Sequence, residues 1–95
     1  MDDNHTTFLV EGSLKPYIEG HHLIPMAAQD YFEYTIDFAD NIVTLCPTCH
    51  RKIHYATADV KAEMLKTLFN QRAALYPKYG ISVNTKLLES FYGII

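Results

Sequence analysis

Four of the five histidines fall into two short groups, and this grouping constrains the fold more than any other feature of the chain. His21 and His22 are adjacent, and His50 and His54 lie four residues apart. Residues four apart on a helix project from the same face, so the second pair can converge on one point. Adjacent side chains on a strand point to opposite faces, so only one member of the first pair can join them. The spacing therefore predicts three histidines at one site and the fourth beside it.

Three converging imidazoles predict a metal ion as their common partner, because imidazole is a frequent metal ligand in proteins. The fourth histidine keeps an uncoordinated ring nitrogen near the ion, where it can act as a base. Taken alone, each histidine would be interpreted as a surface or satisfied core residue. Three nitrogen ligands favour zinc, nickel or manganese, whereas two ligands plus water leave magnesium open, so the identity of the ion depends on His54.

The composition predicts one globular domain over residues 1–95. Hydrophobic residues make up 48% of the chain and charged residues 20%, which is typical of a folded protein rather than a disordered one. No apolar run approaches the roughly 18 residues of a membrane span, and the first residues lack a signal-peptide pattern, so we expect a cytoplasmic protein without membrane contact. Residues 1–45 carry a net charge of −7 and residues 46–95 one of +4. The basic half is a weak indication of a nucleic-acid partner.

The strand and turn signals predict an α+β fold. Residues 6–11 and 15–19 are expected to form a β-hairpin, whose second strand continues until Pro25 ends it. Residues 41–45 predict a further strand. A long connection, 26–40, is expected to contain a helical turn over 27–29. Its aromatic residues, expected to hold it against the core, are Tyr31, Phe32, Tyr34 and Phe38.

The second half of the chain predicts helices. Pro47 can occupy the first turn of a short helix over 47–55. A longer helix is expected to begin at Thr57 or Asp59 and to continue until Pro77, and a short one follows Asn84. The apolar positions of the longer helix recur at spacings of three and four, and they are Val60, Met64, Leu65, Leu68, Phe69, Leu75 and Tyr76.

Cys46 and Cys49 form a Cys-x-x-Cys pair directly before the second histidine group. Two cysteines are too few for a disulfide scaffold. Three interpretations remain open: two buried thiols, a redox pair, or half of a structural zinc site. The zinc site would need further ligands from His5, from another copy of the chain or from preceding residues. The redox interpretation lacks the alternating strands and helices that surround thioredoxin-like pairs.

Two stretches of the chain resemble the HNH endonuclease family, the ββα-metal or His-Me finger nucleases. They are Glu19-Gly20-His21-His22-Leu23-Ile24-Pro25 and the segment from Asp40 to His54, which reads DNIVTLCPTCHRKIH. The resemblance covers about residues 16–56 and is closest to restriction-type HNH domains of bacteria, phages and mobile elements. It implies a ββα-metal core with an N-terminal β-hairpin and with C-terminal packing helices over 57–95.

The resemblance also implies a role for each residue. His22 matches the general base that deprotonates the attacking water, and Asn41 matches the residue that holds the adjoining loop. The metal ligands implied are His21, His50 and, as in the histidine-rich relatives, His54. Arg51 and Lys52 lie where contacts to phosphate would be useful, although a solvated helix face explains them equally well.

The sequence therefore predicts a metal-dependent HNH endonuclease that hydrolyses DNA phosphodiester bonds with one divalent ion, and with an additional structural zinc as an open question. The alternative is a non-catalytic, zinc-stapled nucleic-acid-binding module of the same fold, which has no structural need for His22. The chain shows no evident recognition helix. We expect it to cut without sequence preference, to dimerise, or to be the catalytic part of a longer protein with its own DNA-recognition domain.

Overall fold

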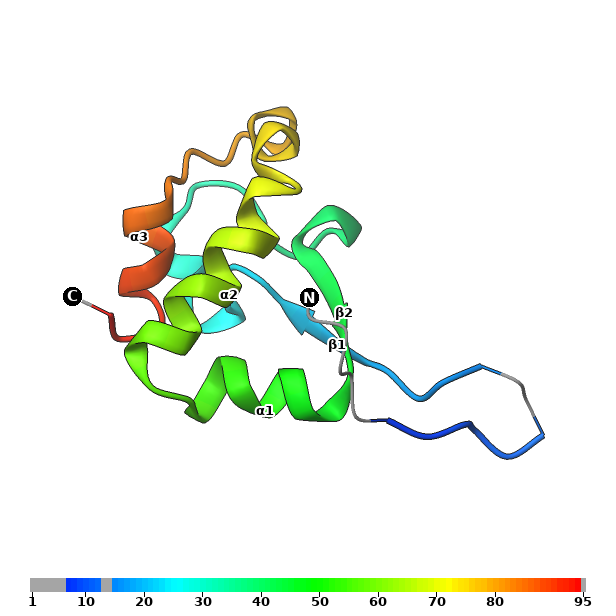
Figure 1. Ribbon diagram of the computed structural model, residues 1–95. Coiled ribbons are helices and arrows are strands. Elements are labelled where there is room, and N and C mark those ends of the chain that lie inside the picture. Colours follow the sequence, from blue (N-terminus) through cyan, green and yellow to red (C-terminus); the bar gives the residue numbers. More distant parts are fainter. Residues whose placement is uncertain (1–6, 13–14, 95) are drawn as a thin grey trace.

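The chain folds into a two-stranded antiparallel sheet followed by helices (Figure 1). The structure is a computed structural model, and it describes residues 7–12 and 15–94. The predicted α+β class is confirmed. With 3-10 helices marked η, the elements in chain order are β1 (Glu19–His22), η1 (Met26–Tyr31), η2 (Ala39–Asn41), β2 (Ile42–Leu45), α1 (Pro47–Tyr55), α2 (Ala58–Asn70), η3 (Ala73–Tyr79) and α3 (Thr85–Ser90).

The pairing of β1 with β2 places the two adjacent histidines on opposite faces of the sheet. His21 lies opposite Val43, and His22 lies opposite Ile42. Val43 is 2% exposed and Ile42 37% exposed, so the sheet has one buried and one open face. Because partners across an antiparallel pair share a face, His21 is directed into the protein and His22 toward the open side.

The strand predicted to run as far as Pro25 ends earlier, at His22. The backbone N–H of Leu23 still donates to the carbonyl oxygen of Asn41, at 2.8 Å. The next N–H, that of Ile24, donates instead to the Asn41 side chain. A side-chain amide therefore replaces the strand ladder, and Pro25 becomes the N-cap of η1.

Two N-terminal strands were predicted over 6–11 and 15–19, and the described residues before β1, 7–12 and 15–18, form an arm that extends away from the body (Figure 1). In the parts of the arm that the structure describes, one isolated bridge joins Leu9 to Pro16 instead of two regular strands. Pro16 has no N–H with which to extend the ladder, and an isolated two-stranded ribbon is marginally stable. Thr6 lies outside the described residues.

The helix predicted over 47–55 is confirmed as α1. Cys46 is its N-cap and Pro47 lies at its start, where the missing N–H of proline costs nothing. The short C-terminal helix is confirmed as α3, and the side chain of its N-cap, Asn84, accepts a hydrogen bond from the Leu87 N–H at 2.8 Å.

The long helix predicted to continue until Pro77 is wrong, because α2 ends at Asn70 and η3 follows. Arg72 lies at the break. Its Nε donates to the carbonyl oxygen of Leu68 in the last turn of α2, and its Nη1 donates to the carbonyl oxygen of Asp40. This side chain satisfies a helix-end carbonyl and ties the end of α2 to η2.

One cluster of buried apolar side chains forms the core, drawn from the sheet, η3, all three α-helices and the long connection. The apolar residues with 0% exposure are Leu23, Ile24, Ile36, Ile53, Leu65 and Leu88. Val60 is 41% exposed, so its predicted place in the core is wrong. No helix in the described part of the chain is long and apolar enough to cross a membrane.

The connection between β1 and β2 contains the predicted helical turn, which extends over η1. Of its four predicted aromatic anchors, Phe32 and Phe38 pack against the core. Tyr31 and Tyr34 are 66% and 56% exposed, so these two predictions are wrong. Phe38 also stacks on Tyr79 of η3, with ring centroids 3.8 Å apart, which holds the end of the connection beside the C-terminal part of the chain.

Candidate metal and nuclease site

Three histidines from two elements meet between β1 and α1. One ring nitrogen from each of His21, His50 and His54 lies within 4.8 Å of the others. His50 and His54 project from one face of α1, and their Nε2 atoms are 3.3 Å apart. The His21 ring lies edge-on to both, with centroids 5.2 Å from His50 and 4.9 Å from His54. Among the described residues, this is the group of side chains that could hold a metal ion.

The environment favours the neutral form of His21 and His54. Burial, followed by the neighbouring His54, His50 and His22, lowers the pKa of His21 from 6.5 to about 4. The pKa of His54 is also lowered, first by burial and then by the charges of His50 and Lys61. A metal-binding imidazole must be neutral, so His21 and His54 are ready to coordinate at pH 7 without losing a proton first.

Glu19 orients one member of the cluster. Its Oε1 lies 3.0 Å from Nδ1 of His50, and its Oε2 accepts a hydrogen bond from the Tyr17 hydroxyl at 3.1 Å. The bond to His50 is the main cause that lowers the pKa of the Glu19 carboxyl. Because a carboxylate can only accept, His50 carries its proton on Nδ1 and directs the lone pair of Nε2 toward His54.

The donors fit a divalent metal ion. Two nitrogens bound about 2.0–2.1 Å from a tetrahedral zinc lie about 3.3 Å apart, and the separation of the His50 and His54 Nε2 atoms is 3.3 Å. A carboxylate on the second nitrogen of a ligating imidazole is a common feature of metal sites, because it fixes the tautomer and raises the basicity of the ligand. The cluster therefore has the three nitrogen donors of a metal site, and one of them, His50, is oriented by the Glu19 carboxylate.

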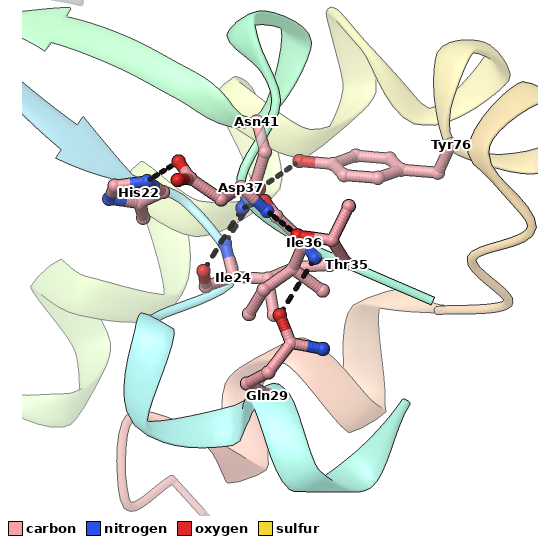
Figure 2. Close-up of polar contacts among 8 residues, drawn as sticks. All are labelled: His22, Ile24, Gln29, Thr35, Ile36, Asp37, Asn41 and Tyr76. Carbon is pink, nitrogen blue, oxygen red and sulfur yellow. Dashed lines mark hydrogen bonds and ion pairs between the residues drawn. The ribbon is translucent and has the colours of Figure 1, made fainter. Parts of the chain in front are cut away.

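His22 lies outside the cluster and has a different partner. Its Nε2 is 2.9 Å from Oδ1 of Asp37, and the two side chains are 31% and 61% exposed (Figure 2). An imidazole paired with a carboxylate carries its proton on the bonded nitrogen and keeps a lone pair on the other. Asp37 belongs to the segment between η1 and η2, and no local pattern in the sequence marks it as a partner of His22.

Asn41 is fully buried and uses its whole side-chain amide (Figure 2). Its Oδ1 accepts from the Ile24 N–H and from the Tyr76 hydroxyl, both at 2.9 Å. Its Nδ2 donates to the carbonyl oxygens of Ile24, at 3.1 Å, and Ile36, at 2.8 Å. Asn41 thus joins the residues that follow β1, the segment that carries Asp37, and η3.

A comparison with known protein families identifies the arrangement. The sequence profile described as HNH endonuclease matches residues 7–56, which is slightly more than half of the chain and includes all the histidines of the site. The chain belongs to the HNH endonuclease family. The predicted resemblance to the HNH endonuclease family is therefore confirmed.

A curated relative of this HNH domain is the Type IV methyl-directed restriction enzyme EcoKMcrA of Escherichia coli strain K12. The two are 39% identical over 69 residues, which is 72% of this chain and 22% of the relative. The chain thus spans about a fifth of the length of the curated relative that it matches. No solved structure gave a significant match.

The cysteine pair of this HNH domain lies at the start of α1, and both thiols are buried. Cys46 Sγ accepts a hydrogen bond from the Cys49 N–H at 3.3 Å, as an N-cap. Within the described residues, the pair is not part of a group of three metal-binding side chains, and His5 lies outside those residues. The structural zinc stays a prediction.

Arg51 and Lys52 are exposed on α1. They line an open surface hollow together with Thr48, Tyr55 and Ala56. An exposed hollow with two cations at its wall suits an anionic group, and contact with phosphate stays a prediction for both residues.

Two partners of the histidines, Glu19 and Asp37, were not among the site residues predicted from the sequence. Glu19 had a usable signal, because it lies two residues before His21 and therefore on the same face of the strand. Asp37 had none, because its approach to His22 depends on the course of the whole connection.

Proposed function

We propose that this chain is the catalytic HNH domain of a metal-dependent DNA endonuclease in which His22 is the general base. The observation that carries the proposal is the division of the four histidines. His21, His50 and His54 converge on one point, whereas His22 lies on the other face of β1 and is paired with Asp37. A structural metal site would need the first three histidines and would have no use for the fourth.

The Asp37 carboxylate determines which nitrogen of His22 acts. Since the carboxylate can only accept, neutral His22 carries its proton on Nε2 and has its lone pair on Nδ1. Nδ1 takes a proton from water as the water oxygen attacks the phosphorus and the bond to the 3′-oxygen breaks. The resulting imidazolium stays paired with Asp37. General-base catalysis of this kind is commonly worth about 10²–10⁴-fold in rate.

His21, His50 and His54 would hold the divalent ion. When bound, the ion supplies Lewis-acid stabilisation of the charge on the phosphoryl and departing oxygens, an effect of several kcal/mol. Asn41 positions the base indirectly, because its backbone carbonyl and side chain hold Leu23 and Ile24 directly after His22.

DNA is the proposed substrate, and the membership of the HNH endonuclease family and the name of the E. coli relative support it. Contacts from Arg51 and Lys52 to backbone phosphates would add affinity without sequence preference. Because the chain spans 22% of the relative, we place the choice of DNA target, including any dependence on methylation, in a further recognition domain or in a dimer.

Nicking of a supercoiled plasmid tests the proposal. Wild type, His22→Ala and the control Ser82→Ala, which changes an exposed residue of the C-terminal segment, are incubated with zinc, nickel, manganese or magnesium. We expect wild type and Ser82→Ala to nick with at least one ion, and His22→Ala to lose about 10²-fold or more in rate while binding the same amount of metal.

Two outcomes would contradict the proposal. If His22→Ala nicked at the wild-type rate, His22 would not be the base. If the wild type bound metal and DNA but cut with none of the ions, the chain would be the non-catalytic binding module instead.

A further inference from the structure

A tyrosine from the end of the chain contacts the most buried histidine of the cluster. Tyr92 lies just after α3, and its hydroxyl oxygen is 2.7 Å from Nε2 of His21. The same oxygen is 2.6 Å from the carbonyl oxygen of Leu23 and 3.5 Å from that of His22. Tyr92 is 71 positions from His21, and it lies outside residues 7–56, which match the HNH profile.

Counting protons assigns the direction of each hydrogen bond. A tyrosine hydroxyl has one proton to donate, and a backbone carbonyl oxygen can only accept. The short contact with Leu23 therefore takes the Tyr92 proton. The contact with His21 then needs a proton from the histidine, so Nε2 is the donor and the Tyr92 oxygen is the acceptor. The opposite assignment would leave two oxygens 2.6 Å apart with no proton between them.

We propose that Tyr92 is a positioning residue that fixes His21 as the Nε2–H tautomer, so that Nδ1 is the nitrogen offered to the metal ion. This inference rests on the proposed metal-binding function of the cluster. His50 is held in the complementary way, because Glu19 accepts from its Nδ1 and leaves Nε2 for the ion. In both proposed ligands, His50 and His21, the nitrogen that carries the proton is thus fixed by a hydrogen-bond partner. These partners are Glu19 of β1 and Tyr92 after α3.

The proposal extends the metal site beyond the ββα core. Leu88 of α3 is fully buried in the core and anchors the segment that carries Tyr92. The same hydroxyl accepts from His21 and holds the chain directly after β1 through Leu23. The C-terminal helical part therefore has a chemical role at the site as well as a packing role.

The test compares Tyr92→Phe with the matched control Tyr79→Phe. Each variant loses one hydroxyl and keeps its ring, and the Tyr79 hydroxyl bonds to Asp40 Oδ2 at 2.7 Å, in a different hydrogen-bonded pair. The first measurement is a long-range ¹H–¹⁵N correlation of the His21 ring in the metal-free protein at pH 7.5. We expect the Nε2–H tautomer in the wild type and in Tyr79→Phe, and a mixture of tautomers in Tyr92→Phe.

The second measurement is calorimetric titration of the metal-free proteins with Zn²⁺. Loss of an outer partner of a metal ligand typically costs 10- to 100-fold in affinity, and we expect a loss of about that size for Tyr92→Phe and none for Tyr79→Phe. An Nδ1–H tautomer in wild-type His21 would overturn the proposal, as would unchanged zinc affinity in Tyr92→Phe.

Neither measurement uses DNA, so the outcome is separate from that of the plasmid assay. A wild type without nuclease activity would refute the proposed function and leave the role of Tyr92 at the zinc site intact. If Tyr92→Phe failed to fold, the tautomer of His21 in the wild type would still decide the question.

Discussion

Two carboxylates at this site act on two different histidines, and their effects can be separated residue by residue. Glu19 bonds to His50 within the cluster, whereas Asp37 bonds to His22 outside it. A carboxylate fixes the tautomer of its histidine and stabilises the protonated ring. The first should therefore influence metal binding, and the second should influence the proton transfer from water.

Asp37→Asn should slow plasmid nicking while leaving zinc affinity unchanged. An asparagine at this position no longer provides a negative charge beside the imidazolium that forms as His22 accepts a proton. We expect the cleavage rate under saturating metal to fall about tenfold or more, which is the usual effect on activity of removing a residue that hydrogen-bonds to a site residue. Single-turnover nicking kinetics and a zinc titration of the same preparation provide the measurement.

Glu19→Gln is the matched comparison, because it also replaces a carboxylate by an amide of nearly the same size. This variant should bind zinc more weakly. A fall in zinc affinity for Asp37→Asn, or no fall for Glu19→Gln, would contradict the assignment of Glu19 to metal binding and of Asp37 to proton transfer.

At the scale of elements, the site depends on how Asn41 holds together the residues after β1, the connection and η3. Its side chain bonds to Ile24 after β1, to Ile36 in the connection and to Tyr76 in η3. The buried Tyr76 hydroxyl donates to Oδ1 of Asn41, a residue that is 0% exposed. Burial raises the pKa of Tyr76 to about 12, so this hydroxyl keeps its proton and remains a donor over the whole working range of pH.

Tyr76→Phe should lower the free energy of unfolding by about 1 kcal/mol, the usual net contribution of a buried hydrogen bond. Urea unfolding followed by circular dichroism measures the change. Tyr79→Phe is the control, since its bond to Asp40 is only partly buried, and it should cost less. Equal stability of Tyr76→Phe and wild type would show that the hydrogen bond from Tyr76 to Asn41 does not contribute to stability.

The sequence predicted the elements where the signal was local, and it failed where distant side chains decide the outcome. The strand predicted over 41–45 is present as β2 from Ile42, and the helix predicted over 47–55 is confirmed as α1; the signals were β-branched residues and Pro47. α2 ends at Asn70, and the side chain of Arg72 at this break reaches Asp40, 32 positions earlier. The early end of β1 depends on the side chain of Asn41, 17 positions from Ile24. Periodicity contains no information about such contacts.

The candidate site shows the same division. The convergence of one member of the His21–His22 pair with His50 and His54 was predictable because a strand alternates by two and a helix repeats near four. The resemblance to the HNH family indicated that this member is His21. The contact of Tyr92 with His21 spans 71 positions. The sequence predicted only a short helix after Asn84 in this part of the chain, because a hydroxyl that reaches a distant imidazole leaves no local pattern.

At the scale of the whole molecule, the proposed ion joins β1 to α1 and should stabilise the fold. A ligand that binds only the folded chain adds about 2.7 kcal/mol at a free concentration 100 times its dissociation constant. We expect Zn²⁺ at that level to raise the unfolding temperature of the metal-free protein, and a chelator to reverse the change.

Thermal unfolding followed by circular dichroism measures the effect, and His54→Ala is the control. This variant changes an exposed residue that we propose as a ligand, and it leaves the core intact. Its metal-free stability should therefore stay close to that of the wild type, while the response to zinc becomes smaller. An unfolding temperature that zinc leaves unchanged in the wild type would contradict binding at the cluster.

The placement of His21 and His22 on opposite faces of β1 has a consequence for how such a chain can vary. Because the pleat repeats every two residues, sliding β1 by one position along β2 would exchange the surroundings of the two imidazoles. The ring that now faces α1 would turn outward beside Asp37, and its neighbour would turn inward toward Tyr92. Insertions and deletions ahead of Glu19 are thus tolerable only where the register between β1 and β2 stays the same. A chain that kept every required side chain could still lose its function if this register shifted by one residue.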